Sequence, residues 1–130
     1  MPNFHPECPK NPKCPPDEAT FANGMVWRGV KDPPITEEHF KSHAELELPN
    51  CDKGNCAHWG LSVWVKEDDV HHARKLHRYM RRWYIAAGVL NATDGKIMPT
   101  PNGNQPGHHT FWKFHDHAVA PKFQIVMQPA

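Results

Sequence analysis

Alternating hydrophobic and polar positions predict β-strands in four parts of the chain. Residues 24–30 (GMVWRGV) form the first predicted strand. Residues 61–66 (LSVWVK) give the clearest signal, because they are β-branched or aromatic and alternate with a period of two. Residues 109–114 and 123–128 show the same preference near the C-terminus and predict two further strands.

Two helices are predicted between these strands. Residues 36–46 begin with Thr36, a suitable N-cap, and two glutamates follow it at the positive end of the helix dipole. Residues 67–87 predict the longest helix, because hydrophobic side chains recur there every three or four positions. Residues 89–98 predict a short hairpin around the favoured turn pair Asp94-Gly95.

This order of elements predicts a single α+β domain over residues 21–130. We expect a four- or five-stranded sheet, mostly antiparallel or mixed, with two helices on one face. Residues 1–20 precede it as a proline-rich arm, since six of them are prolines, which fix φ and remove backbone donors. The arm is either mobile or pinned to the domain through a metal bound by its cysteines.

The composition is close to neutral but rich in imidazole. The 130 residues carry a formal charge of +1 and include 11 histidines, so the chain lacks the strongly basic balance of a general nucleic-acid-binding domain. No apolar run reaches the roughly 20 residues that cross a bilayer, and the N-terminus lacks the apolar core of a signal peptide. These features predict a cytoplasmic protein with no membrane partner.

The cysteines predict a structural metal site in such a reducing compartment. Thiolates are preferred zinc ligands, and a shared zinc ion would hold the arm against the domain. The hypothesis is a zinc-stabilised, non-catalytic module that binds another protein; the alternative is free thiols in two unrelated loops. The four ligands would be Cys8, Cys14, Cys51 and Cys56.

Histidines near the C-terminus suggest an alternative metal site. His115 and His117 would share one face of an extended segment, because side chains in a strand repeat every two residues. With His109 from a neighbouring strand they would form the open three-ligand arrangement of hydrolytic zinc enzymes. The alternative is a polar strand end without a metal.

An arginine in the middle of an apolar strand points to a ligand. Arg28 is costly to bury unless it binds an anion or a carboxylate; the alternative is an edge-strand arginine with its guanidinium in water. We predict a polar pocket that binds or acts on a phosphate-containing or nucleotide-like ligand, and whether the domain is an enzyme stays open. The predicted catalytic residues are His108, His109 and Arg28, and the predicted ligand-binding residues are Arg28, Ser62, Trp27 and Trp112.

A run of cations on the longest predicted helix suggests a second kind of partner. Five lysines and arginines occur between Arg74 and Arg82. Such a face can contact phosphates of a nucleic acid, although a solvated helix surface is the simpler interpretation.

Two short motifs resemble known families. Val26-Trp27-Arg28-Gly29, followed by Gly60-Leu61-Ser62-Val63, resembles the first two motifs of ADP-ribosyltransferases of the Arg-Ser-Glu type. The resemblance implies that Arg28 holds the NAD phosphate and that the strand of Ser62 shapes the nicotinamide pocket. The catalytic glutamate of that family is missing, since no glutamate follows Glu67 and Gln124 stands in the last predicted strand.

The second motif is Gly-His-His at residues 107–109, which resembles a signature of HNH-type toxin nucleases. The resemblance implies a metal-dependent nuclease in which one of these histidines activates water. That family needs a following helix with a further metal ligand, whereas Pro121 and a predicted strand follow here. His115 or His117 would have to supply the missing ligand.

Overall fold

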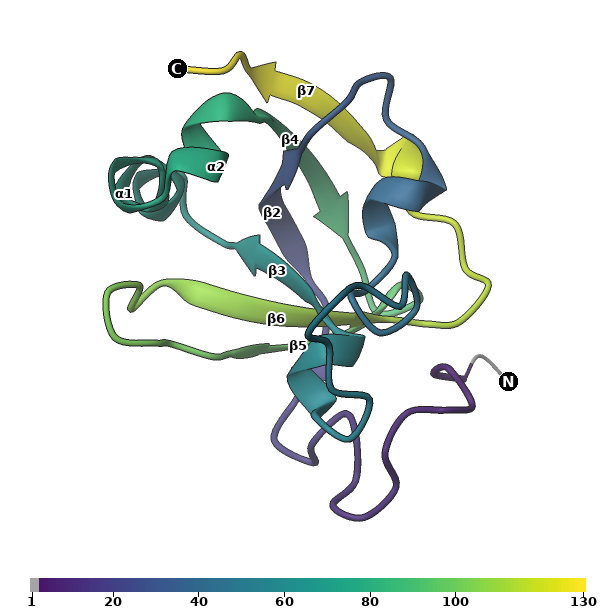
Figure 1. Cartoon of the computed structure of the whole chain (residues 1–130). Coiled ribbons are helices and arrows are strands. Elements are labelled where there is room, and N and C mark those ends of the chain that lie inside the picture. Colours follow the sequence, from purple (N-terminus) through teal and green to yellow (C-terminus); the bar gives the residue numbers. More distant parts are fainter. Residues whose placement is uncertain (1–2) are drawn as a thin grey trace.

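The computed structural model describes residues 3–130 and shows an α+β fold built on one open sheet (Figure 1). The sheet has seven strands in the order β1-β5-β6-β3-β2-β4-β7, and all neighbouring strands are antiparallel. The strands are β1 (Thr20–Phe21), β2 (Gly24–Val30), β3 (Leu61–Trp64), β4 (Tyr84–Leu90), β5 (Gly95–Pro99), β6 (His108–Lys113) and β7 (Phe123–Met127). The helices are α1 (Glu67–Leu76) and α2 (Arg78–Arg82), with 3-10 turns η1 (Glu37–Phe40), η2 (Cys56–Trp59) and η3 (Ala120–Lys122).

The predicted fold class is confirmed, but the sheet is larger than four or five strands. The four strands with clear alternation correspond to β2, β3, β6 and β7. The extra strands are β1, which has only two residues, and β4 and β5, which fall where a helix end and a hairpin were predicted.

The single long helix predicted over residues 67–87 is wrong. α1 ends at Leu76, His77 is extended with φ −122° and ψ 120°, and α2 then runs only to Arg82. From Tyr84 the chain is strand β4, which pairs with β2 on one side and β7 on the other. Tertiary pairing here outweighs the helix preference of Ala86 and Ala87.

The first predicted helix, over residues 36–46, is reduced to the single turn η1. In a continuing α-helix the carbonyl of His39 would accept from the backbone of His43. Instead it accepts a hydrogen bond of 3.0 Å from Nε of Arg28. The side chain of Arg28 therefore takes the bond that would have extended the helix.

The predicted hairpin over residues 89–98 is also wrong. β4 and β5 follow each other in the chain, yet β4 lies between β2 and β7 while β5 lies between β1 and β6. Asp94 and Gly95 do form the connection, but it carries the chain across to the other half of the sheet.

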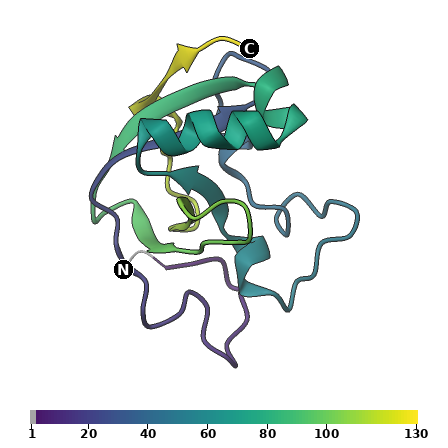
Figure 2. The same ribbon diagram turned by 90° about the vertical axis from the view of Figure 1, so that its left-hand side faces the viewer.

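Hydrophobic side chains cover both faces of the sheet. α1 and α2 pack on one face (Figure 2), where a core of five buried residues joins them to β3 and β4. That core is Trp64, Val70, Ala73, Met80 and Ile85. The opposite face carries the largest core, which includes Val26, Val63 and Phe111 and is closed by Phe40 of η1 and Ala120 of η3.

The arm packs against the domain and is pinned by a disulfide. Cys14 is bonded to Cys56, 42 residues later. The ring of Phe4 lies 4.9 Å from that of Phe114, and His5 lies 4.7 Å from Trp59. These contacts form a third core beneath the arm.

Candidate functional site

An exposed serine and a histidine are hydrogen-bonded on the helix-bearing face of the sheet. Ser62 of β3 pairs with Thr110 of β6, and Trp64 pairs with His108. Side chains alternate along strands, so these four residues share one face. The hydroxyl oxygen of Ser62 lies 2.9 Å from Nε2 of His108.

The other ring nitrogen of His108 fixes the tautomer that we assign. Nδ1 lies 3.1 Å from the carbonyl oxygen of Thr100 and 2.9 Å from its hydroxyl. A carbonyl can only accept, so Nδ1 carries a proton in this bond and Nε2 of the neutral ring accepts from Ser62. The Thr100 hydroxyl lies 2.8 Å from that of Thr110. The ring is also held edge-on against Trp64, with centroids 5.6 Å apart.

The environment of His108 favours the neutral ring. Burial lowers its pKa below the ordinary value, the hydrogen bond to Thr100 acts in the opposite direction, and the charge of His109 lowers the pKa further. At neutral pH the imidazole is therefore uncharged and has a free lone pair at Nε2. A serine, a base that accepts its proton and a third group that orients the base are the parts of an activated nucleophile.

The guanidinium of Arg28 contacts the backbone of β3, although its position in β2 faces the opposite side of the sheet from Ser62. Val26 and Val30, two residues on either side of Arg28, lie in the core of that opposite face, whereas Trp27 packs against the helix-side core. Nη1 of Arg28 donates to the carbonyl of Ser62 at 2.8 Å and its Nε donates to that of His39. A single registered pair, Trp27 with Trp64, joins β2 to β3, so the guanidinium bridges the strands where they separate. Burial lowers the pKa of Arg28 to about 10, and the group is still a cation at neutral pH.

One nitrogen of this guanidinium stays available. Nη2 of Arg28 makes no hydrogen bond to residues 3–130. In the same part of the chain, Nε of Arg74 is the one fully buried side-chain nitrogen or oxygen without a partner. The phenol of Tyr79 is close enough to feel this charge: burial raises its pKa and Arg28 lowers it.

The remaining pocket residues predicted from the sequence do not join this group. His109 is adjacent to His108 in β6 and therefore points to the opposite face. Trp112 is buried beneath the arm, where its indole donates to the carbonyl of Cys56. Trp27 packs against the helix-side core. Strand alternation therefore removes His109 from the group, and core packing removes Trp27 and Trp112.

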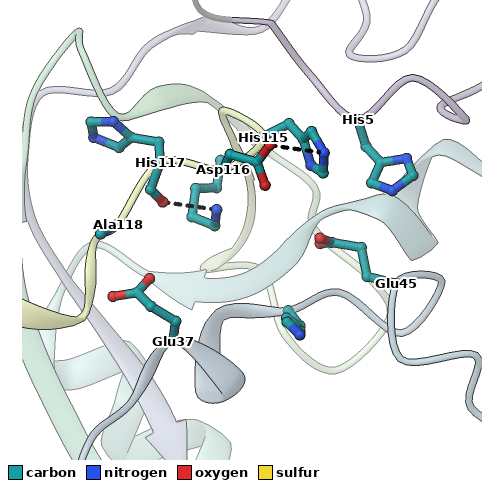
Figure 3. A pocket seen from close by; sticks show the side chains of 9 residues that line it. His5, Glu37, Glu45, His115, Asp116, His117 and Ala118 are labelled. Carbon is teal, nitrogen blue, oxygen red and sulfur yellow. Dashed lines mark hydrogen bonds and ion pairs between the residues drawn. The ribbon is translucent and has the colours of Figure 1, made fainter.

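The other predicted histidines line a polar cleft of about 420 Å³ between the arm, η1 and the loop after β6 (Figure 3). His115 and His117 point away from each other in this cleft (Figure 3). The ring of His115 meets that of His5 at 4.6 Å, whereas Nε2 of His117 lies 2.8 Å from the carboxylate of Asp94.

The common face expected for His115 and His117 is absent because the segment is a turn. Asp116 between them has φ 60°, a left-handed conformation. His109 lies elsewhere, against a different pocket. Within residues 3–130 no group of three or more histidines, cysteines, aspartates or glutamates is placed to hold a metal ion.

The cysteines form a covalent link in place of the expected thiolate cluster. Cys14 and Cys56 are bonded, while Cys8 and Cys51 are free thiols. Burial, with a contribution from Glu45, raises the pKa of Cys8 to about 11. A disulfide persists mainly in oxidising compartments, so this link fits an extracellular location better than the predicted cytoplasmic one.

The basic stretch between Arg74 and Arg82 is partly used inside the molecule. Arg74 donates to the carbonyls of Trp83 and Gln128, and Arg81 donates to those of Arg74 and Lys75 at the end of α1. Three exposed cations remain for a partner, namely Lys75, Arg78 and Arg82.

Two further predictions from the sequence concern helices. After β6 the described chain continues through a turn and η3 into β7, so the helix that the HNH resemblance requires is not found there. In residues 3–130 there is also no helix with the length and apolar character to cross a membrane.

Comparison with known protein families, curated proteins and solved structures finds no match to this chain. The evidence for the candidate site is therefore its geometry. Thr100 and Tyr79 were missed from the sequence, since Thr100 lies between the predicted hairpin and the strand after it, and Tyr79 lies within the predicted long helix. Only the cross-strand register of β3, β5 and β6 identifies Thr100.

Proposed function

We propose that the chain is a small enzyme that binds a phosphate-containing ligand and transfers its phosphoryl group to Ser62. The observation that carries the proposal is the 2.9 Å hydrogen bond between the exposed Ser62 hydroxyl and Nε2 of a neutral, oriented His108. General-base assistance of this kind contributes about 10²–10⁴-fold to a reaction rate.

Ser62 and His108 can carry out the proposed phosphoryl transfer with the proton that they share. The Ser62 proton moves to Nε2 of His108 as the serine oxygen forms a bond to phosphorus. The bond from phosphorus to the leaving oxygen breaks, and the imidazolium returns the proton to that oxygen. In the second step the imidazole takes a proton from water as the water oxygen bonds to phosphorus. The bond from phosphorus to the serine oxygen breaks, the imidazolium returns the proton to that oxygen, and phosphate leaves.

A cation bonded to the backbone carbonyl of Ser62 favours a phosphate over a neutral acyl substrate. Arg28 is held by two carbonyls, and its Nη2 makes no hydrogen bond to residues 3–130. A guanidinium anchored in this way matches phosphate oxygens with little loss of side-chain freedom.

ADP-ribosyl transfer is not part of this proposal. Gln124 of β7, where that family places its glutamate, pairs with Ala87 of β4. β7 is three strands from β3 in the sheet, which is about 14 Å at ordinary strand spacing. No carboxylate from that strand supports Ser62.

Covalent labelling tests the nucleophile. A fluorophosphonate should modify the native protein once, at Ser62, as measured by intact-protein and peptide mass spectrometry. Ser62→Ala should abolish the adduct. The chain has one other serine, the buried Ser42, so Ser42→Ala is the matched control and should label normally. Equal labelling of native protein and Ser62→Ala would refute the proposal.

The labelling rate should depend on the protonation of His108. Because burial lowers the pKa of this imidazole, the base is neutral at pH 7 and becomes protonated only on acidification. The rate should be constant from pH 8 to 7 and fall to half at a pH below 6.5. His108→Ala should be slower by about 10²-fold and should lose this step. A half-point above 6.5 would contradict the assignment.

Phosphate should protect Ser62 through Arg28. Inorganic phosphate at millimolar concentration is expected to slow labelling of the native protein, measured as the rate of adduct formation. Arg28→Lys keeps the charge but loses the two-carbonyl anchor, so it should weaken protection about tenfold. Undiminished protection in Arg28→Lys would show that the anion binds elsewhere.

A further inference from the structure

A second pocket lies on the opposite face of the sheet from the Ser62–His108 pair. Its volume is about 390 Å³, within the range of small-molecule sites. The ends of five strands and the segment after β1 surround it. Its walls include Val26, Val65, Leu90, Ile97, Met98 and His109.

The lining of this pocket is apolar apart from a few polar groups. No lysine, arginine, aspartate or glutamate lines it. Met25 at its rim is 47% exposed, so hydrophobic surface faces solvent there. An apolar cavity of about 150 Å³ is enough for a benzene-sized molecule, and this pocket is more than twice as large.

His109 gives the pocket a directional hydrogen-bond acceptor. Its Nδ1 lies 3.0 Å from the carbonyl of Gly107. Since a carbonyl only accepts, we assign the tautomer with the proton on Nδ1, in which Nε2 has a lone pair. Nε2 makes no hydrogen bond to residues 3–130. A ligand with an O–H or N–H group would satisfy it.

From these features we infer that the pocket binds a small aromatic or aliphatic molecule with one hydrogen-bond donor, which donates to Nε2 of His109. The apolar walls supply most of the affinity, and the donor fixes the orientation. This site does not depend on Ser62, because adjacent residues of β6 serve opposite faces of the sheet.

Two naphthalene derivatives that differ only in the donor test the inference. 1-Naphthol has a hydroxyl, whereas 1-methoxynaphthalene has none and is otherwise similar in shape. Each should be titrated into protein with ¹³C-labelled leucine and isoleucine methyl groups at pH 7.5. The signals of Leu90 and Ile97, which line the pocket, should move, and that of Ile85, in the helix-side core, should stay.

The native protein should bind 1-naphthol about fivefold more tightly than 1-methoxynaphthalene, the ratio expected for one neutral hydrogen bond. His109→Leu should bind both equally, and Val65→Trp, which fills the pocket, should bind neither. Ser62→Ala should behave like the native protein. Unmoved Leu90 and Ile97 signals at saturating probe, or an unchanged ratio in folded His109→Leu, would overturn the inference.

Discussion

Replacement of Cys14 and Cys56 by serine should lower the free energy of unfolding by about 4 kcal/mol. The bond closes a loop with a sequence separation of 42 residues, and the loop-entropy relation gives about this value for that length. The proline-rich arm has little regular structure of its own, so losing the bond should also release residues 3–19 from the core around Trp59 and Trp112. Denaturant unfolding measures the change.

The same experiment separates the disulfide from the zinc site predicted from the sequence. Cys51→Ser removes a free thiol and should change the free energy of unfolding by less than about 1 kcal/mol. A reductant should destabilise the native protein, whereas a chelator should leave its melting temperature unchanged. Unfolding by the chelator together with tightly bound zinc would support the four-cysteine site instead.

Replacement of Asp94 by asparagine should cost about 3 kcal/mol of stability. This carboxylate is fully buried and accepts from Lys122 at 2.5 Å, from His117 at 2.8 Å and from the backbone of Asn91 at 2.8 Å. Removing one partner from a buried ion pair leaves the other charge uncompensated. The partners are about one-third exposed, which places the expected cost at the low end for such pairs. Asp116→Asn, at an exposed carboxylate, is the matched control and should be nearly neutral.

The stabilisation from Asp94 should disappear in acid. Burial alone raises its pKa, but the hydrogen bonds from Lys122, Asn91 and His117 lower it, and the net pKa lies below the ordinary 3.8. A carboxyl with a depressed pKa stabilises the fold above 3.8, and this contribution is lost as the pH falls through the folded-state value. Unfolding curves of native protein and Asp94→Asn should therefore converge below pH 3.8. A difference that persists at pH 2 would contradict the role of the ion pair.

The strands rich in β-branched and aromatic residues could be predicted from the sequence, and the alanine-containing strand β4 could not. β2 and β3 alternate clearly because each carries polar or exposed positions between its buried side chains. β4 is buried on both faces from Ile85 to Gly88, so it has no period of two. Ala86 and Ala87 continue the three- and four-residue spacing of apolar side chains in α1, so the local pattern favours a helix. Pairing with β2 and β7 makes the segment a strand instead.

In the candidate site, too, some residues could be predicted from the local sequence pattern, whereas others depend on which strands pair. Arg28 and Ser62 could be singled out because a cation and a hydroxyl interrupt apolar strands. The choice between His108 and His109 depends on which face each ring occupies, and only the pairing of β6 with β3 decides it. Thr100 has no local signal, since it reaches His108 across the loop that joins β5 to β6.

The tautomer of His108 is the property on which the proposed chemistry depends most directly. Nitrogen-15 NMR of the histidine rings at neutral pH measures it. We predict a neutral ring with the proton on Nδ1 and an unprotonated Nε2, whose resonance shifts in Ser62→Ala when the donated hydrogen bond is lost. A proton on Nε2, or a charged ring at pH 7, would show that His108 cannot accept the Ser62 proton and would contradict the proposed nucleophile.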